Sequence, residues 1–140
     1  AVVAGLLLSA MCLISMSLKL TVEPSSGSSI SKTTTYSADS QIQVDLAVAN
    51  GGTNIEHVVA FDKDSLQAIY LVSDQDVTLK TNSSGSPADT IALLANVPFI
   101  WADDGYIAVP FSADVTKFYW TNASGTTANI QGKILWDATP

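Results

Sequence analysis

The pattern of hydrophobic residues changes near the beginning of the chain. Residues 1–13 form an almost unbroken apolar run, whereas apolar and polar residues alternate from Ile14 to Glu23. Alternation with a period of two is typical of a strand that buries one face. The sequence therefore predicts an apolar N-terminal arm, residues 1–13, and a strand from Ile14 to Glu23 that joins this arm to the rest of the fold.

After Pro24 the chain reads as strand, turn and strand almost to its end. The expected strands lie within residues 30–37, 41–49, 55–61, 66–73, 76–81, 90–96, 98–102, 105–111, 116–122 and 129–137, and clusters of Gly, Pro, Asp, Asn or Ser bound them. Such spacing predicts an all-β fold, an antiparallel β-sandwich of about eight to ten strands with Greek-key or jelly-roll-like connections. We expect one such domain over residues 14–140.

The same alternation predicts which side chains form the core. Residues at every second position of a strand share one face of the sheet, and the apolar members of these sets are expected inside. The predicted core residues are Ile42, Val44, Leu46, Ile69, Leu71, Val77, Leu79, Ile91 and Ile134.

Composition narrows the classes of partner. Charged residues make up 14% of the chain, against roughly 25% in typical soluble domains, and the net charge is −7. All six basic residues are lysines, and arginine is the side chain that best recognises phosphates and base edges. We therefore expect no nucleic-acid partner. A surface with so few charges must consist largely of Ser, Thr, Asn and Gln, or be covered by other proteins.

The sequence offers little for metal binding or thiol chemistry. Cys12 and His57 are the single cysteine and the single histidine. A single cysteine excludes an intramolecular disulfide. One cysteine and one histidine do not suffice for a zinc site of the usual composition. By alternation His57 shares one face of its strand with Ile55 and Val59, so we interpret it as a structural residue on an inward or edge position. No cofactor or metal is expected.

Acidic pairs are the remaining candidates for catalysis or calcium binding. Three pairs of aspartates stand close together: Asp62 and Asp64, Asp74 and Asp76, Asp103 and Asp104. Aspartate close to Gly or Ser is frequent in tight turns, and the glycine and distal glutamate of a calcium-binding EF-hand loop are missing. We interpret all three pairs as turn residues, expect no catalytic residue, and conclude that the chain is not an enzyme.

Aromatic residues suggest a binding surface. Trp101, Tyr119, Trp120 and Trp136 are expected either in the core or at an aromatic interface between subunits. Together with Tyr70 and Tyr106 the tryptophans also allow a sugar-stacking platform. Asn82 and Asn122 stand in Asn-X-Ser patterns that match glycosylation sites but lie in Ser-rich turns.

The apolar arm allows several interpretations. As a helix, residues 1–13 would be about 20 Å long, too short to cross a bilayer, and no basic residue precedes Lys19 as the start of a signal peptide requires. A pilin-like helix buried in a filament remains an alternative. We favour an assembly arm that neighbouring subunits cover, because so large an apolar patch exceeds those of soluble monomers. Its expected interface residues are Ala1, Val2, Val3, Leu6, Leu7, Leu8, Met11 and Leu13.

One long stretch carries a more specific signal than composition. It runs from "DSLQAIYLVSDQDVTLKTN" through "SSGSPADTI" and "VPFIW" to "DVTKFYWTNAS", and the C-terminal "ILWDATP" follows it. These motifs resemble a family of small structural proteins encoded by tailed bacteriophages, over most of the chain from about Leu18 to Pro140. The resemblance implies a virion protein of β-sandwich type. Residues 1–13 depart from the family pattern, so the resemblance assigns them no role.

These observations together lead us to expect a non-enzymatic virion structural protein, a capsid-associated decoration or cement protein or a minor structural subunit. Its expected partners are the major capsid protein or other virion subunits and further copies of the same chain, in a homo-oligomer. A membrane location is not expected. The alternatives are a pilin-like filament subunit, with the N-terminal segment as a helix in the filament core, and a carbohydrate-binding module.

Overall fold

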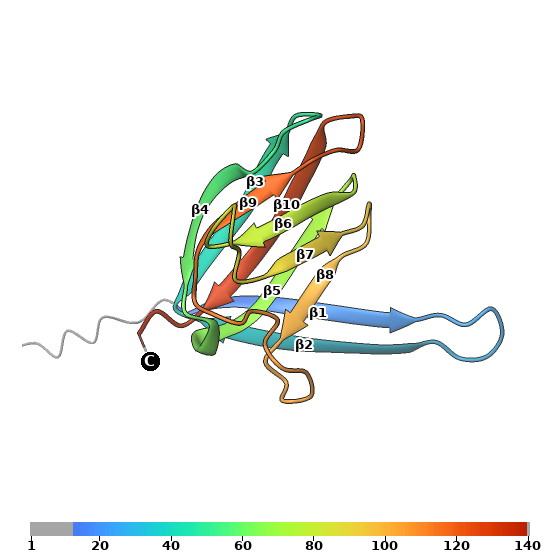
Figure 1. The fold of residues 1–140 in the computed structure, drawn as a ribbon. Helices are drawn as coiled ribbons and strands as arrows, with labels where there is room; N and C mark the ends of the chain where they lie inside the picture. Colours follow the sequence, from blue (N-terminus) through green and yellow to red (C-terminus); the bar gives the residue numbers. More distant parts are fainter. Residues whose placement is uncertain (1–12, 140) are drawn as a thin grey trace, which may run out of the picture.

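The computed structural model describes residues 13–139, and over this range the chain is built almost entirely of strands (Figure 1). Ten strands and one short 3-10 helix follow one another along the sequence. The strands are β1 (Ile14–Val22), β2 (Ile30–Ala38), β3 (Ser40–Val48), β4 (Ile55–Phe61), β5 (Leu66–Ser73), β6 (Val77–Thr81), β7 (Thr90–Leu93), β8 (Phe99–Ala102), β9 (Val115–Thr121) and β10 (Ala128–Trp136), and the 3-10 helix is η1 (Lys63–Ser65).

Two four-stranded sheets face each other and make the body of the molecule. The strand order is β3-β10-β5-β8 in one sheet and β4-β9-β6-β7 in the other. All pairs within both sheets are antiparallel. The predicted fold class, an all-β antiparallel sandwich, is therefore confirmed.

The order of the strands identifies the jelly-roll form of the sandwich. The chain passes from one sheet to the other at almost every connection, and only β6 and β7 are consecutive partners within a sheet. As a result β3 and β10, the first and last strands of the body, are hydrogen-bonded neighbours from Ser40 and Trp136 to Val48 and Ala128. Eight strands wound in this way form a double Greek key, the jelly roll.

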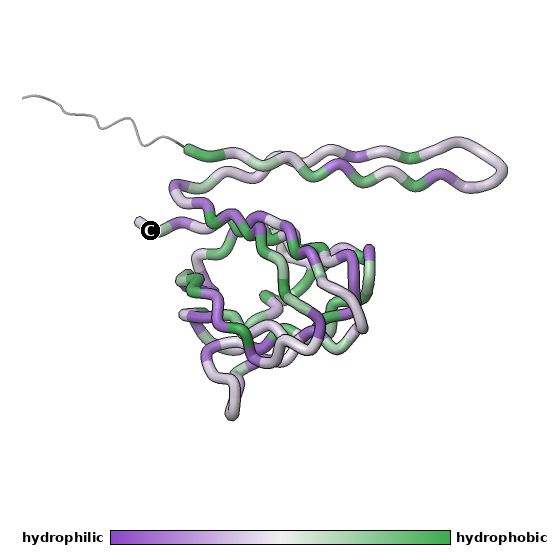
Figure 2. Tube along the Cα trace, turned by 90° about the horizontal axis from the view of Figure 1, so that it is seen from above, coloured by the Kyte–Doolittle hydropathy of each residue, from purple (hydrophilic) through white to green (hydrophobic). Residues whose placement is uncertain are grey.

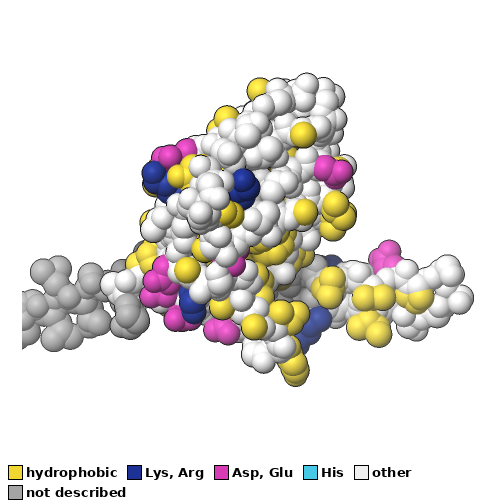
Figure 3. Space-filling model, viewed as in Figure 1, with side chains coloured by type: hydrophobic (Ala, Val, Ile, Leu, Met, Phe, Trp, Pro, Cys, Tyr) yellow, Lys and Arg dark blue, Asp and Glu magenta, His cyan; other side chains and the backbone are white. Residues whose placement is uncertain are grey.

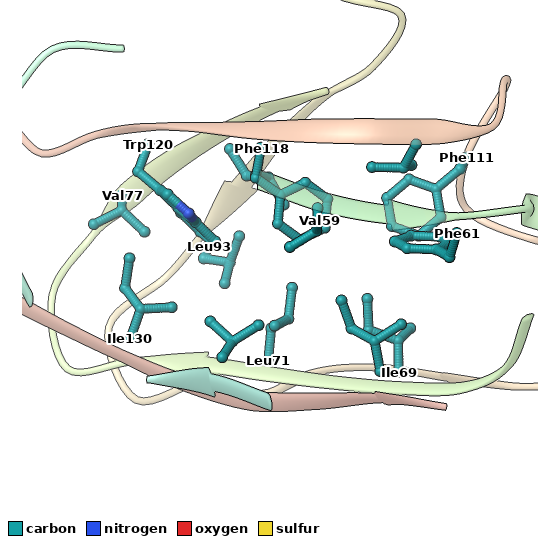
Figure 4. Close-up of a cluster of buried hydrophobic side chains, with 14 of the residues drawn as sticks. Val59, Phe61, Ile69, Leu71, Val77, Leu93, Phe111, Phe118, Trp120 and Ile130 are labelled. Atoms are coloured by element: carbon teal, nitrogen blue, oxygen red, sulfur yellow. The ribbon is translucent and has the colours of Figure 1, made fainter. Parts of the chain in front are cut away.

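The core lies between the two sheets, as Figure 4 shows. All nine predicted core residues belong to it; Ile42, Leu46 and Ile91 are partly buried and the other six are buried. Aromatic rings at its centre meet edge to face: the ring centroid of Phe118 lies 5.7 Å from that of Trp120 and 6.3 Å from that of Phe61. Such contacts stabilise aromatic pairs beyond the area that they bury.

Close packing within the β3-β10-β5-β8 sheet requires a glycine in β10. A Cβ atom on Gly132 would overlap the carbonyl oxygen of Tyr70 and would lie 2.8 Å from Cδ2 of Leu71. Only a residue without a side chain fits here.

The strands β1 and β2 form a separate hairpin outside both sheets. They pair in register from Ile14 opposite Ala38 to Val22 opposite Ile30. Seen from above, the hairpin runs along one side of the body and its tip reaches well past it (Figure 2). The strand predicted over Ile14–Glu23 is present as β1, but it pairs with β2 outside the sandwich, whose strands begin at Ser40.

The strand expected over residues 105–111 is absent. In the structure this segment is a loop between β8 and β9. The indole Nε1 of Trp101 donates a hydrogen bond of 3.0 Å to the carbonyl oxygen of Ile107, and Pro110 has no backbone N–H for a sheet. The loop is thus fixed by a side chain rather than by a neighbouring strand.

Candidate interaction surface

The hairpin has one apolar face and one polar face. Ile14, Met16, Leu18, Leu20 and Val22 of β1 share a face with Ala38, Tyr36, Thr34, Lys32 and Ile30 of β2. Serine and threonine dominate the opposite face, where hydroxyl pairs lie within hydrogen-bonding distance across the strands. The alternation that the sequence shows from Ile14 onward thus creates two chemically distinct surfaces.

The half of the hairpin near its base is anchored to the body. Ile14, Met16 and Tyr36 pack against a small buried cluster on the outer face of the β3-β10-β5-β8 sheet. The body contributes Ala68 and Leu135 to this cluster. The base of the hairpin is therefore a second, smaller core.

The other half of the hairpin, residues 18–34, carries an uncovered apolar face, which we call the open face: Leu20, Val22 and Ile30. These side chains are 69%, 57% and 72% exposed. Figure 3 shows hydrophobic side chains along the projecting hairpin. A two-stranded hairpin is only marginally stable by itself in water, so an uncovered apolar face at this place indicates a surface that a partner covers.

A groove lies where the hairpin leaves the body. It has a volume of about 470 Å³ and is lined by Leu18, Lys19, Leu20, Lys32, Thr34 and Tyr36 of the hairpin and by Tyr70, Ile100, Trp101, Ala102, Asp104 and Ile107 of the body. Ile100 is 50% exposed and Ile107 is 70% exposed. The body wall of this hairpin groove is largely apolar, whereas the hairpin wall combines apolar residues with Lys19, Lys32 and Thr34. The open face continues the hairpin wall toward the tip.

Charge is unevenly distributed between the hairpin and the rest of the chain. Residues 14–38 carry Lys19, Lys32 and Glu23, a net charge of +1, whereas residues 39–140 carry four lysines and twelve acidic residues, a net charge of −8. Within the described part of the chain the ion pairs are Lys63 with Asp64 and Lys117 with Glu56. The two lysines of the hairpin are therefore available to a partner.

The base of the hairpin is tied to the C-terminal segment. The Asp39 carboxylate accepts hydrogen bonds from the hydroxyl of Thr139 and from the backbone amides of Ala138, at 2.6 Å, and Thr139, at 3.0 Å. The hydroxyl of Thr139 and the amide of Ala138 lower the pKa of Asp39 to about 2. These bonds hold the turn between β2 and β3 against the end of β10 and so fix the direction of the hairpin.

His57 faces inward from β4, an edge strand. Its ring is partly buried and meets that of Phe118 edge to face, with 6.5 Å between the ring centroids. Burial lowers the pKa of His57. Its Nδ1 has no hydrogen-bond partner among residues 13–139. This position agrees with the structural interpretation.

The aspartates of the three pairs lie in the connections between strands. The carboxylate of Asp62 accepts a hydrogen bond from the amide of Asp64, and that of Asp104 accepts one from the amide of Tyr106. Asp74 binds both the backbone and the side-chain amide of Asn129, each at 2.7 Å. Over the described range no group of three or more His, Cys, Asp or Glu side chains could hold a metal ion.

Of the four aromatic residues expected in the core or at an interface, two lie in the core. Trp120 is fully buried and Trp101 is only 8% exposed, because both indoles point into the core. Trp136 packs partly buried against the same core. Tyr119 lies on the outer face of β9, where its hydroxyl is 3.4 Å from a carboxylate oxygen of Glu56. Neither Trp101 nor Trp120 is available for stacking on a sugar.

Both Asn-X-Ser matches use their side chains internally. The buried Asn122 donates from Nδ2 to the carbonyl oxygens of Val48 and Thr126, and its Oδ1 accepts from Ser124. Asn82 donates from Nδ2 to the carbonyl oxygen of Asp114. Asn122 therefore serves as a polar anchor between the ends of β3, β9 and β10.

Most of the predicted arm lies outside the described residues: Ala1, Val2, Val3, Leu6, Leu7, Leu8 and Met11. Leu13, the first described residue, is 62% exposed. Between residues 13 and 139 there is no helix with the length and hydrophobicity that a membrane span requires.

Sequence reasoning missed the open face. The signal was present, since the apolar alternation continues to Val22, the turn-forming "PSSGSS" begins at Pro24, and a β-branched segment begins at Ile30. Two strands joined by a turn that contains Gly favour a hairpin. Its projection away from the body follows from tertiary packing, which the pattern does not contain.

Comparisons with protein-family models, with curated proteins and with solved structures gave no match. The candidate interaction surface therefore rests on the geometry of this chain alone.

Proposed function

We propose that this protein is a non-enzymatic structural subunit of a bacteriophage particle, associated with the capsid and bound to the major capsid protein or other virion subunits. The observation that carries the proposal is the projecting hairpin, whose open face at Leu20, Val22 and Ile30 is uncovered. A free monomer gains nothing from such a surface, whereas a subunit of an assembly buries it against a neighbour.

Two further observations support the same function. The eight-stranded jelly roll is an architecture used by viral capsid proteins, although lectins and cupins share it, so the fold is compatible with the proposal and does not carry it. Sequence motifs between Asp64 and Gly125 resemble those of structural proteins of tailed phages. The candidate carbohydrate-binding function has less support, because neither Trp101 nor Trp120 is exposed for stacking.

Quantitative mass spectrometry of virus particles, purified from the lysate in which the chain is made, tests this function. We expect the chain in the particles at a fixed ratio to the major capsid protein. A chain that is abundant in the lysate and missing from the particles would overturn the proposal. Recovery from the membrane fraction alone would favour the pilin-like alternative.

Two changes to the chain, with one control, test whether residues 1–13 and the open face determine how many copies of the chain bind to each particle. Deletion of residues 1–13 is expected to leave the jelly roll folded, since its strands begin at Ser40, and to lower occupancy if the segment is an assembly arm. Leu20→Asp places a charge on the open face. Thr21→Asp places the same charge on the polar face of the same strand and serves as its control.

A further inference from the structure

We propose that β3, an edge strand of the body, pairs antiparallel with β3 of a second copy of this chain and so joins two β3-β10-β5-β8 sheets into one continuous sheet. This pairing goes beyond the proposed function, because it involves the edge of the body rather than the open face of the hairpin. The partner is identified by the backbone of β3 and by the order of its side chains.

Within residues 13–139 the two sheets of the body have four edge strands, and three of them are protected against pairing with another chain. The edge strands β7 and β8 have only four residues each, and a shift in register between Val58 and Phe61 interrupts β4. Short edge strands and bulges are common ways in which proteins prevent contact between sheet edges. These three edges therefore offer little regular backbone to a partner.

The fourth edge strand, β3, has neither protection. It is nine residues long, and its register with β10 is regular from Ser40 to Val48. It contains no proline and no lysine, and its single charged residue, Asp45, is exposed. Among the described residues only β10 pairs with it, so its other edge lacks a neighbouring strand. An uninterrupted edge of this kind is a template for strand pairing.

Two apolar side chains of β3 are incompletely covered. Ile42 and Leu46 pack against the core but are only partly buried, whereas Val44 between them is 1% exposed. A strand added at this edge extends the inner face of the sheet past both side chains. The edge thus offers apolar area as well as backbone hydrogen bonds to a partner.

The order of side chains along β3 makes the strand complementary to itself. With a two-fold axis at Val44, all nine residues of the strand have a partner. Ile42 then lies opposite Leu46 of the second copy on the inner face, and Gln43 lies opposite Asp45 of the second copy on the outer face. Directly opposite residues interact across an antiparallel pair. Apolar side chains therefore meet on one face, and an amide donor meets a carboxylate on the other.

The neighbouring registers are less favourable. With the axis at Asp45, the two Asp45 carboxylates lie directly opposite each other, and like charges in this position destabilise a sheet. With the axis at Gln43, Leu46 lies opposite Ser40 and the last two residues of β3 have no partner in the strand. The axis at Val44 is therefore the register that the sequence of β3 favours.

The pairing leaves both hairpins free. The base of the hairpin packs on Leu135 of β10 and Ala68 of β5, and its groove lies beside Ile100 of β8. The hairpin therefore runs toward and past β8, the edge opposite to β3 (Figure 1). In the dimer the two hairpins project from opposite ends of the joined sheet. Such a dimer presents two identical open faces, and two linked contacts bind more tightly than one.

Substitution of Gln43 tests the pairing through the sign of the added charge. Sedimentation equilibrium of the purified full-length chain measures the dissociation constant of the dimer. Gln43→Lys places a lysine opposite Asp45 in both halves of the contact and is expected to lower the constant severalfold. Gln43→Glu places like charges opposite each other and is expected to raise it about tenfold.

Thr90 provides the matched control for these charges. Thr90→Lys and Thr90→Glu make the same changes of charge at an exposed position on β7, an edge of the other sheet, and should leave the constant unchanged. Circular dichroism checks that all four variants are folded. Opposite shifts at Gln43 that are absent at Thr90 support the pairing. Equal shifts at both positions, no shift at either, or a wild-type chain that is monomeric at about 100 μM would overturn it.

Disulfide formation identifies the register. In a Cys12→Ser background, Gln43→Cys chains are mixed with Asp45→Cys chains and oxidised. Directly opposite residues of an antiparallel pair have Cα atoms about 5 Å apart, within the range of a disulfide, so the mixture should form covalent dimers. Each variant alone places its two cysteines on a diagonal and should form few. Efficient dimers from Asp45→Cys alone, or none from the mixture, would contradict the axis at Val44.

The dimer and the proposed function can fail separately. Dimerisation is measured on the purified chain, whereas the function is measured on particles. A chain that is monomeric in solution and still occupies particles would overturn the pairing of β3 and leave the function in place. A dimer that is missing from particles would overturn the function and leave the pairing.

Discussion

The backbone amide of Asp39 donates a hydrogen bond of 3.2 Å to the carboxylate of Asp137, 98 residues further along the chain. The bonding is reciprocal, because the Asp39 carboxylate accepts from the amides of the two residues that follow Asp137. The two aspartates thereby connect the start of β3 to the end of β10 at the base of the hairpin. The orientation of the hairpin is fixed at this point.

Asp39→Asn is therefore expected to lower stability near neutral pH and to flatten its dependence on acidity. The folded state lowers the pKa of Asp39 from 3.8 to about 2, so its contribution is fully present above 3.8 and is lost as the pH falls through about 2. Thermal unfolding of both proteins from about pH 6 down to pH 2 measures the difference. Asp45→Asn, on the adjoining strand β3, controls for the loss of one negative charge. A variant that parallels the wild type over this range would contradict the assignment.

Gly132→Ala is expected to destabilise the body by about 3 kcal/mol. The added Cβ overlaps the carbonyl oxygen of Tyr70 on the neighbouring strand, and backbone cannot give way as a flexible side chain can. Urea unfolding followed by tryptophan fluorescence measures the loss. Gly85→Ala is the matched control, because a Cβ there meets nothing within 4 Å. Equal stability of the two variants would show that β5 and β10 can separate to admit the methyl group.

Asn122→Asp is expected to cost about 2–4 kcal/mol of folding free energy. The substitution removes both hydrogens of Nδ2, so the carbonyl oxygens of Val48 and Thr126 lose their donor and a carboxyl group is buried in its place. Chemical denaturation at neutral pH measures the change. Asn50→Asp serves as the control, since Asn50 is exposed and only its Oδ1, which aspartate keeps, accepts a bond from Gly125. A cost below about 1 kcal/mol would mean that water replaces the lost donors.

Trp101→Phe is expected to release the loop between β8 and β9 without unfolding the body. Phenylalanine keeps most of the buried ring but lacks the Nε1 donor that holds the carbonyl oxygen of Ile107. Hydrogen exchange of amides around Ile107 should rise about tenfold while that of β5 and β10 stays the same. Trp136→Phe makes the same change elsewhere and should leave the loop protected. Unchanged exchange at Ile107 would show that other contacts hold the loop.

Much of the body could be predicted from the sequence because a period of two assigns each side chain to a face. Val44 and Ile134, for example, are inside as expected. The same rule is uninformative where aromatic residues stand at consecutive positions, as in Phe118, Tyr119 and Trp120: either face is apolar enough to be the inner one. The structure buries Phe118 and Trp120 and leaves Tyr119 on the outer face.

Other features depended on contacts between distant residues, which a local pattern does not record. Periodicity identified β1 as a strand but not as half of a separate hairpin, since it does not specify which strand pairs with which. The loop at residues 105–111 has the composition of a strand. It is held instead by Trp101, whose indole reaches Ile107 from the preceding strand.

The adjacency of β3 and β10 has a consequence for synthesis of the protein. β10 is the hydrogen-bonded partner of both β3 and β5, so the sheet cannot be completed until residues through Trp136 have left the ribosome. The strands β1 and β2 pair only with each other and can begin to pair earlier, but the base of the hairpin has its full packing only once Leu135 of β10 is in place. A translation product that stops short of β10 would expose the inner faces of both sheets and be open to proteolysis. A chain that stops before β10 therefore lacks both the strand that closes the body and part of the cluster that anchors the hairpin.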